Sequence, residues 1–423
     1  MVKKFDDRQY TRDEFQEIAA HLSRKAKHAT IIAATGTGKT RIAIIRLLAM
    51  NEASLDYKAI VVVPDHQVRQ SFQEKIELFR ILNTEVVVIN SLVNRIKRER
   101  TINTDFLILD EVHNYATVQR FVVFTKIVRT STLCLTATLA RQDGRHVLIQ
   151  RHCPVIVNVS LKTAMMQGWV NNFVVKNVYV PLTKEEKVQY DHFNSMFEEN
   201  FPHFYSRGLP LQMASIMGSP LQTMFRTIKD ISFRKQLAYY KGITPESMMG
   251  IAVKCNKGMQ GRKQILLNSK AKLEMAKVLG RKLPFKKGVM TFSETIKVCE
   301  QMTQILGGKS YHSELKKDVK QKNLKKFLDG KVKYLHTATS MDEGFDIPNL
   351  NAIIIIAGKS TDRQMKQRVG RVIRLAQNKG ISVIYNLCIE NSQDEKWSLK
   401  RFEGIPAANI EHIRFDELLA ELQ

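Results

Sequence analysis

The chain has 423 residues, of which 66 are Lys or Arg and 41 are Asp or Glu, so its formal net charge at pH 7 is +25. Hydrophobic residues make up 44% of it, which excludes a disordered chain and a small disulfide-stapled one, because enough apolar material is present to form several cores. The positive surplus favours a polyanionic partner, with nucleic acid as the first candidate and acidic lipid as the second.

The cysteines and the chain's first residues bear on its location. The five cysteines, Cys134, Cys153, Cys255, Cys299 and Cys388, form no CxxC pair or Cys/His cluster with zinc-ligand spacing. The first ten residues lack the apolar segment of a secretion signal, and aliphatic runs such as residues 352–357 are too short to cross a bilayer. We therefore expect reduced thiols, an intracellular and cytoplasmic location, and no membrane partner.

Short aliphatic runs recur along the first part of the chain, each followed by residues of helical character. They lie at residues 29–33, 59–63, 85–90, 105–110 and 132–136. Continuous apolar runs without alternation are typical of strands covered on both faces, and hence of a parallel sheet between helices. The pattern predicts an α/β lobe over residues 1–159.

A second series of strand candidates lies at residues 288–292, 332–337, 352–357 and 382–387. It predicts a second α/β lobe over residues 262–423, which includes a lysine-rich helix at 314–328 and a closing amphipathic helix at 409–422. Residues 160–261 are expected to form a connector and a mostly helical insertion associated with this lobe. The aromatic side chains of the insertion are expected in its core rather than as stacking platforms for bases.

The sharpest local signal is the stretch AATGTGKT at residues 33–40, between a strand candidate and a helix candidate. Backbone N–H groups can converge on a phosphate only where the chain turns tightly, which Gly36 and Gly38 permit. Lys39 would reach the β- and γ-phosphates, and the Thr40 hydroxyl would ligate Mg²⁺. The usual first glycine of this pattern is replaced by Ala33. The residues expected to bind ATP here are Thr35, Gly36, Thr37, Gly38, Lys39 and Thr40.

Two adjacent carboxylates follow the strand candidate at 105–110. Asp110 would hold Mg²⁺, usually through water, and Glu111 would orient and deprotonate the attacking water. Because kinases, GTPases and many ATPases share these two elements, they define only a site that hydrolyses a nucleoside triphosphate.

Four motifs together resemble those of the superfamily 2 helicases. They are DEVH at 110–113, TAT at 136–138, GFDIP at 344–348 preceded by Thr339, and QRVGRVIR at 367–374. These are similar, in the same order, to the DExH box, the motif that couples hydrolysis to strand grip, the T…EGxDIP motif and the QRxGRxxR motif. The family implies two RecA-like lobes with ATP between them.

One branch of that family is the nearer resemblance. Residues 135–144, LTATLARQDG, are similar to the TATPxRxDG stretch of the branch that holds restriction-enzyme motor subunits, transcription-repair helicases of the B type and phage recombination helicases that remodel branched DNA. The compact size is typical of a small-genome, viral origin, which would place the protein in the cytoplasm of a bacterial host cell.

The resemblance also implies roles for individual residues. Gln16 would contact the adenine, and Gln367 would help to orient water. Arg371 and Arg374 would be arginine fingers from the second lobe, which neutralise charge on the γ-phosphoryl group and make hydrolysis depend on lobe closure.

Further positions follow from the same resemblance. Gly344 and Asp346 would lie near the ribose or the fingers, and His113 would bridge the lobes with Gln367, Thr136 or Thr138. Contacts to the strand are expected from Pro64, Arg69, Ser91, Ser293 and Thr339, because hydroxyl and backbone groups at helix N-termini bind phosphates without reading sequence. The chain departs from the family at Asp65 and Ser91, where Thr is usual.

The choice of polymer and of activity rests on smaller signals. DEAD-box RNA helicases carry the motifs DEAD, SAT and HRxGR, whereas this chain carries DEVH, TAT and QRVGR, which favours DNA as the polymer. The alternative function is an RNA helicase or RNA-stimulated ATPase. A third interpretation is an ATP-gated nucleic-acid-binding module whose motor has decayed. Only a few residues separate Ile356 from the helix expected near Thr361, which leaves no room for a strand-separating hairpin. We therefore expect movement on duplex or branched DNA, or annealing.

In the insertion, Lys254, Lys257, Arg262 and Lys263 either extend the DNA track or solvate a helix.

Overall fold

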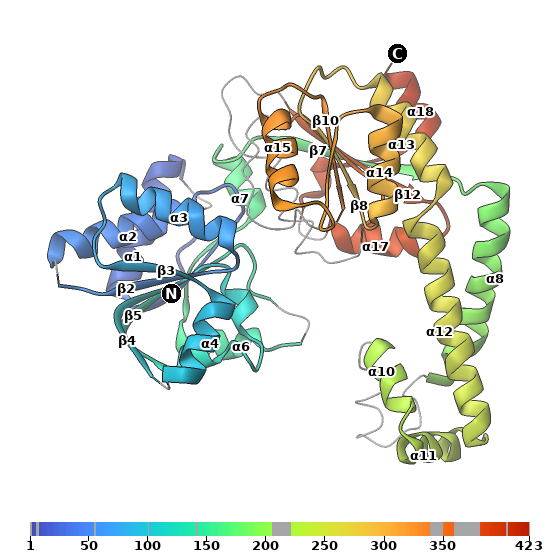
Figure 1. The fold of residues 1–423 in the computed structure, drawn as a ribbon, viewed down its shortest axis with the longest axis horizontal. Helices are drawn as coiled ribbons and strands as arrows, with labels where there is room; N and C mark the ends of the chain where they lie inside the picture. Colours follow the sequence, from blue (N-terminus) through green and yellow to red (C-terminus); the bar gives the residue numbers. More distant parts are fainter. Residues whose placement is uncertain are drawn as a thin grey trace.

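The computed structural model of the protein describes residues 2–5, 8–54, 56–99, 101–140, 143–204, 221–338, 350–358, 381–402 and 405–422. Two α/β lobes and a helical stalk make up this part of the chain (Figure 1). Within it, no helix has the length and apolar character needed to cross a membrane, and the five cysteines are buried and free.

The first lobe is a parallel sheet of six strands in the order β3-β2-β4-β5-β1-β6. The aliphatic runs become its strands: β1 (His28–Ala33), β2 (Ala59–Val63), β3 (Thr84–Val88), β4 (Ile102–Leu109) and β5 (Ile127–Thr136), with β6 (Val155–Val159) at the edge. Every residue of β2 is buried, as expected for a strand covered on both faces. The helices of the lobe are α1 (Arg12–Lys25), α2 (Lys39–Ala53), α3 (His66–Leu78), α4 (Ile89–Glu99), α5 (Val122–Thr125) and α6 (His146–His152), with a 3₁₀ turn η1 (Val112–Tyr115).

The second lobe is a parallel sheet of seven strands in the order β13-β7-β12-β11-β8-β10-β9. Its strands are β7 (Phe173–Val180), β8 (Val289–Ser293), β9 (Lys309–Tyr311), β10 (Tyr334–Ala338), β11 (Ala352–Ile355), β12 (Ser382–Ile389) and β13 (Ile410–Arg414). Its helical segments are α13 (Lys270–Lys282), α14 (Ile296–Leu306), α15 (Lys317–Leu328), α17 (Gln393–Arg401), η3 (Ala407–Asn409) and α18 (Phe415–Glu421). The expected pair of α/β lobes with parallel sheets is thereby confirmed.

Three strands of the second sheet were not expected: the short edge strand β9, which lies within the predicted lobe, and β7 and β13. Strand β7 comes from the segment expected to be a connector, and α7 (Leu161–Met166) leads into it. Strand β13 occupies part of the stretch expected to be a closing helix, so that helix is limited to α18. The reason is pairing: Ile410 to Arg414 lie in parallel register with Val175 to Tyr179 of β7, and Ile413 is buried by this arrangement. Backbone hydrogen bonds of the sheet prevail over a weak helical pattern.

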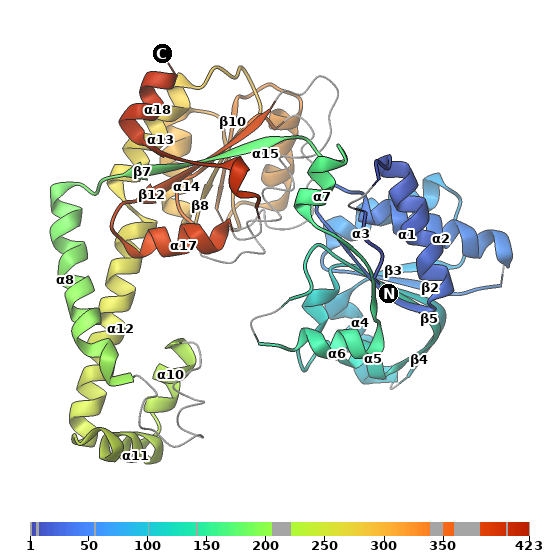
Figure 2. The ribbon, with the colours of Figure 1, turned by 180° about the vertical axis from the view of Figure 1, so that it is seen from behind.

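The insertion forms a stalk of two long helices, α8 (Lys184–Asn200) and α12 (Pro245–Leu267), which projects from the second lobe (Figures 1 and 2). The short helices η2 (Phe201–Phe204), α10 (Leu221–Ile228) and α11 (Ile231–Lys241) lie toward its far end. Helix α12 continues without a break past the boundary expected at residue 261. Gly258 allows the two long helices to approach closely, because a Cβ there would lie 2.7 Å from the Phe193 carbonyl oxygen and the Phe197 amide nitrogen.

Aromatic residues of the insertion divide into two sets. Phe197 and Phe204 are buried in a separate core at the far end of the stalk, as expected. Tyr239 and Tyr240 of α11 differ, since 81% and 48% of their surfaces are exposed. The expectation of a core role therefore does not hold for these two tyrosines.

Candidate ATP site and nucleic-acid surface

The loop between β1 and α2 has the backbone shape that a phosphate cradle needs. Gly36 and Gly38 adopt positive φ angles of 88° and 93°, a region that residues with a Cβ rarely enter. A Cβ on Gly38 would also overlap the Gln16 amide nitrogen. Helix α2 begins directly after Gly38 without a side-chain cap, so the positive end of its dipole lies beside the loop.

Gln16 is buried against this loop, which local sequence alone would not show. A capping box of Thr11 and Glu14 fixes the start of α1, and Gln16 lies one turn further on, with 2% of its surface exposed. Its Nε2 donates a hydrogen bond to the Thr37 carbonyl at 2.9 Å, whereas its Oε1 is buried without a partner among the described residues. A buried orphan acceptor beside a phosphate loop fits a donor such as the amino group of adenine.

The two expected carboxylates lie at the C-terminal end of β4. The Asp110 amide donates to the Val62 carbonyl at 2.9 Å, which fixes the residue at the carboxyl end of the sheet. Burial, and then the charge of Glu111, raises the pKa of the Asp110 carboxyl to about 7, although Lys39 opposes the shift. Buried carboxylates that repel each other are stabilised by a divalent cation. The oxygen donors of Asp110 and Thr40 therefore fit Mg²⁺.

Glu111 and His113 are held by an unusual backbone and by one another. Glu111 adopts φ 49° and ψ 50° as the N-cap of η1, a conformation that costs a non-glycine residue about 1–3 kcal/mol and tends to occur at functional sites. Its Oε2 lies 3.3 Å from His113 Nδ1, and 16% of the Glu111 side chain is exposed. The carboxylate is thus open to a water molecule while its other contact is a buried imidazole.

The three residues expected to couple hydrolysis to strand grip are brought together. His113 Nδ1 lies 2.8 Å from Thr136 Oγ1 at the end of β5, and that hydroxyl donates to the Thr138 carbonyl at 2.7 Å. Because the hydroxyl hydrogen is engaged in this way, Nδ1 is the donor to Thr136 and carries a hydrogen. The Thr138 amide also donates to Thr136 Oγ1 at 3.2 Å.

Several expected residues lie outside the described part of the chain. They are Thr339, Gly344, Asp346, Gln367, Arg371 and Arg374. The short loop that left no room for a hairpin lies there as well, from residue 359 onward.

Among the expected strand contacts, the first-lobe positions lie at helix starts. Pro64 and Arg69 are half-buried around the start of α3, and Ser91 is exposed in the first turn of α4. Asp65, which departs from the family pattern, caps α3, since its Oδ1 accepts from the amides of Gln67 and Val68 at 2.7 and 2.9 Å. An aspartate before a helix is a strong capping signal that explains the departure.

Two positions considered for nucleic-acid contact are buried: Ser293, expected to contact the strand, and Arg262, for which a DNA-track role and a helix-solvating role were both open. Ser293 is buried at the end of β8, and its hydroxyl lies 3.0 and 3.2 Å from the carbonyls of Thr295 and Thr337, so it is not presented to a strand. Arg262 is buried in the stalk, where its guanidinium lies 3.7 Å from the Phe197 ring centroid and donates to Asn194 Oδ1 at 2.9 Å. Both residues stabilise the fold. Lys254 and Lys257 of α12 remain exposed.

Two parallel α/β lobes, the first with a phosphate loop and paired carboxylates, define an NTPase of the RecA-like class. Residues 4–141 match the family described as the type III restriction enzyme, res subunit, and residues 260–376 match the helicase conserved C-terminal domain. Together these matches span more than half of the chain. The chain therefore belongs to the superfamily 2 helicases, among those related to restriction-enzyme and repair helicases, and is an ATP-dependent enzyme that acts on nucleic acid.

Individual relatives and solved structures agree with this assignment. The chain is 24% identical to the DNA 3'-5' translocase XPB2 of Sulfurisphaera tokodaii over 92% of its length and 84% of the relative. It is also 24% identical to putative helicase 22 of the Sulfolobus islandicus filamentous virus, over 96% and 68% of the two chains.

The solved structures are more distant and show the fold alone. The Pyrococcus furiosus Hef helicase domain matches with a TM-score of 0.54 at 13% identity, over 91% of this chain and 97% of that one. S. cerevisiae Dbp5 bound to RNA and ADP BeF3 matches with a TM-score of 0.59 at 13% identity, over 96% and 91%.

Proposed function

We propose that the protein is an ATP-dependent translocase that moves on duplex or branched DNA or remodels it. The observation that carries this proposal is the pair of contacts that joins Glu111 to His113 and His113 to Thr136, next to Asp110, which senses the charge of Lys39 in the phosphate loop. They lie in a chain similar to a DNA translocase over nine-tenths of its length. In this scheme residues 1–159 form the ATP-binding lobe, and residues 262–423 together with β7 form the second lobe.

Each ATP-site residue of the first lobe has a distinct role in hydrolysis. The loop amides and Lys39 hold the β- and γ-phosphates, and Gln16 holds the adenine through its free acceptor. Thr40 and Asp110 would hold Mg²⁺, which supplies positive charge to the phosphates. Glu111, exposed beside that site, orients the attacking water and accepts its proton.

The second lobe completes the site only when the lobes close. Arg371 and Arg374 would neutralise the charge that develops on the γ-phosphoryl group, Gln367 would orient the water, and Gly344 and Asp346 would lie near the ribose or the fingers. Arginines delivered from a second lobe make the rate depend on lobe position, and a motor needs that dependence. His113 links Glu111 to Thr136 and Thr138. Through these contacts, a change at Glu111 on ATP cleavage would alter the strand-binding side of the lobe.

The strand is held mainly through its phosphates. Pro64, Arg69, Ser91 and Thr339 supply contacts that do not read sequence, and the net charge of +25 supplies long-range attraction. The similarity to a viral helicase supports an origin in a virus and action in the cytoplasm of its host cell.

The proposal is tested by ATP hydrolysis without polymer and with single-stranded DNA, duplex DNA, a four-way DNA junction or single-stranded RNA. The Lys39→Ala variant serves as the control for contaminating ATPase. We expect DNA to stimulate hydrolysis most, with branched DNA above single strands, and the control to be inactive. Stimulation chiefly by RNA would replace DNA translocation with an RNA-dependent activity, and no stimulation by any polymer would refute the motor.

A further inference from the structure

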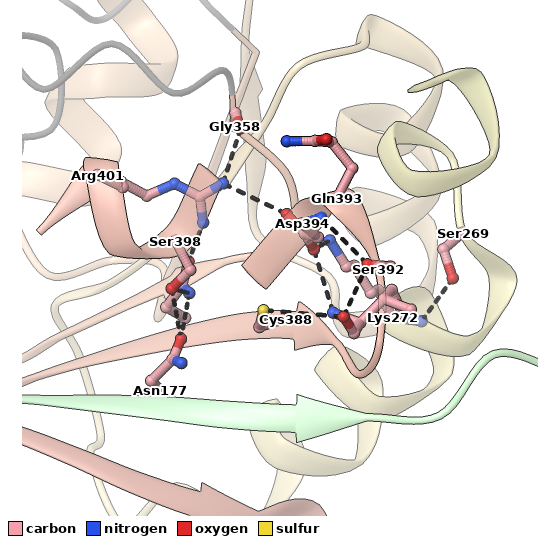
Figure 3. A network of polar contacts seen from close by, with 12 residues as sticks. Asn177, Ser269, Lys272, Gly358, Cys388, Ser392, Gln393, Asp394, Ser398 and Arg401 are labelled. Atoms are coloured by element: carbon pink, nitrogen blue, oxygen red, sulfur yellow. Dashed lines mark hydrogen bonds and ion pairs between the residues drawn. The ribbon is translucent and has the colours of Figure 1, made fainter. Parts of the chain in front are cut away.

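A buried polar network lies in the second lobe (Figure 3). Its centre is Asp394 of α17, which forms an ion pair with Lys272 of α13 and lies 3.6 Å from the Nη2 atom of Arg401. All three side chains have at most 2% of their surface exposed. Apolar side chains of similar volume are often as stable as buried charges, so a buried ionic cluster calls for an explanation besides stability, such as the fixing of a specific geometry.

The orientation of the Arg401 guanidinium is fixed from two sides. Nη1 donates to Asn386 Oδ1 on β12, and the Asn386 amide in turn donates to Asn177 Oδ1 of β7 at 2.6 Å and to Ser398 Oγ at 3.0 Å. Asp394 holds the opposite side. A guanidinium presents its donors in a rigid plane, so these partners also determine where its remaining N–H groups point.

A further contact of Arg401 is to the backbone just beyond β11. Arg401 Nη2 donates to the Gly358 carbonyl at 2.7 Å, as Figure 3 shows. Ile356, two residues earlier, is still hydrogen-bonded to the Phe292 carbonyl of β8 at 2.9 Å. Gly358 is therefore the point at which the chain leaves the sheet, and the sequence continues directly into residues 359–380, which contain Arg371 and Arg374.

We propose that Arg401 is a positioning residue for ATP hydrolysis, which holds the Gly358 carbonyl and so fixes the point from which the segment that contains the two arginine fingers begins. The inference rests on the proposed function, because it assumes that Arg371 and Arg374 act on the γ-phosphate. Lysine cannot replace this arginine, since a single ammonium cannot reach Asp394, Asn386 and Gly358 in fixed directions at once. Positional errors of about 1 Å in a catalytic group cost up to about a hundredfold in rate.

The test compares Arg401→Lys with Lys272→Met in steady-state ATP hydrolysis with the stimulating DNA. Both variants break the same ion cluster, but only the first touches Gly358. We expect Arg401→Lys to lower kcat by at least about tenfold and to leave the KM for ATP within about twofold, because the phosphate loop and Gln16, which are proposed to bind most of the nucleotide, lie in the first lobe. Lys272→Met should keep its kcat within about twofold even where its Tm falls further.

Parallel variants separate this inference from the proposed function. If Arg371→Ala retains the wild-type kcat, the finger assignment itself is wrong. If Arg371→Ala loses activity while Arg401→Lys does not, or if Lys272→Met loses as much as Arg401→Lys, the positioning role is refuted. Should Arg401→Lys fail to fold, Asn386→Ala loosens the guanidinium and keeps the arginine; a lower kcat at unchanged KM supports the proposal, and an unchanged kcat overturns it.

Discussion

The imidazole of His113 and the hydroxyl of Thr136 are joined by a 2.8 Å contact through Nδ1, and the same nitrogen lies 3.3 Å from a Glu111 oxygen. One buried ring therefore faces both the expected general base and the motif after β5. A shift of the Glu111 carboxylate toward a water molecule would change the acceptor that Nδ1 serves. In the proposed function, this arrangement links hydrolysis to the strand-binding side of the lobe.

Thr136→Val should uncouple the two activities, because it keeps the side-chain shape and removes the hydroxyl. We expect the rate without polymer to stay unchanged and stimulation by DNA to fall about five- to thirtyfold, which corresponds to about 1–2 kcal/mol. ATPase rates with and without saturating DNA provide the measurement. Thr138→Val is the matched control, since Thr138 contacts Thr136 through its backbone. Equal stimulation in Thr136→Val and wild type would contradict the link.

Gln16→Ala should weaken discrimination between bases. The buried Oε1 of Gln16 is a free acceptor, and its loss removes one hydrogen bond to adenine of about 1 kcal/mol or more. We expect the KM for ATP to rise about tenfold while that for GTP changes little. Glu17→Ala, an exposed neighbour on α1, is the control. If the KM for both nucleotides rises equally, Gln16 only supports the Thr37 carbonyl of the loop.

The strands β7 and β13, which the sequence did not predict, differ in composition from predicted strands such as β2 and β11. Strands such as β2 and β11 are continuous aliphatic runs buried on both faces, which gives a signal of their own. Strand β7 carries Lys176 and Asn177, and β13 has mostly exposed residues at the sheet edge. Their strand structure depends on partners distant in sequence, so no local pattern announces it.

The same distinction applies to the site. The phosphate loop and the DEVH stretch are local motifs, and their residues were predicted. The burial of Ser293 and Arg262 depends on packing between distant segments, and both were assigned to the surface. Arg401 had no local signal, because its partners Gly358 and Asn386 lie just beyond β11 and on β12, distant from it in sequence.

Helix α12 of the stalk contains two glycines that provide a matched pair of substitutions. Gly258→Ala should destabilise the stalk, because the new Cβ would meet backbone atoms of α8 at 2.7 Å. Overpacking of this kind costs about 1–3 kcal/mol. Gly250→Ala in the same helix meets nothing within 4 Å and should stabilise it by about 0.5–1 kcal/mol through helix propensity. Thermal unfolding followed by far-UV circular dichroism compares them, and a shift of the same sign in both would contradict the close packing.

His336 should make the second lobe sensitive to acid. Its Nε2 donates to the Gly307 carbonyl at 2.8 Å, and its Nδ1 lies 2.8 Å from Thr291 Oγ1, from which it accepts when the ring is neutral. Burial lowers the pKa of His336 from 6.5 to about 4. The unfolded chain therefore takes up a proton first as the pH falls, and stability is lost between about pH 6.5 and pH 4, by up to about 3 kcal/mol.

The contribution of His336 is isolated by comparison with His336→Gln, which does not titrate. Urea midpoints at pH 7.5, 6 and 5 should fall less steeply for the variant than for the wild type, whatever the variant's stability at pH 7.5. Parallel slopes would mean that the imidazole titrates normally in the folded protein.

Substitution of Lys254 and Lys257 tests whether the stalk is part of the DNA track. They lie three residues apart on the exposed side of α12, so both can approach the same backbone. If they contact phosphates, Lys254→Glu/Lys257→Glu should weaken duplex binding and lower the slope of log K against log salt by about 2, because about 0.9 counterions are released per phosphate. Fluorescence anisotropy at several salt concentrations measures both quantities. Lys184→Glu/Lys187→Glu on α8 makes the same change in net charge and should leave the slope unchanged. Equal effects from the two pairs would show that only overall charge matters, and the stalk lysines would then merely solvate their helix.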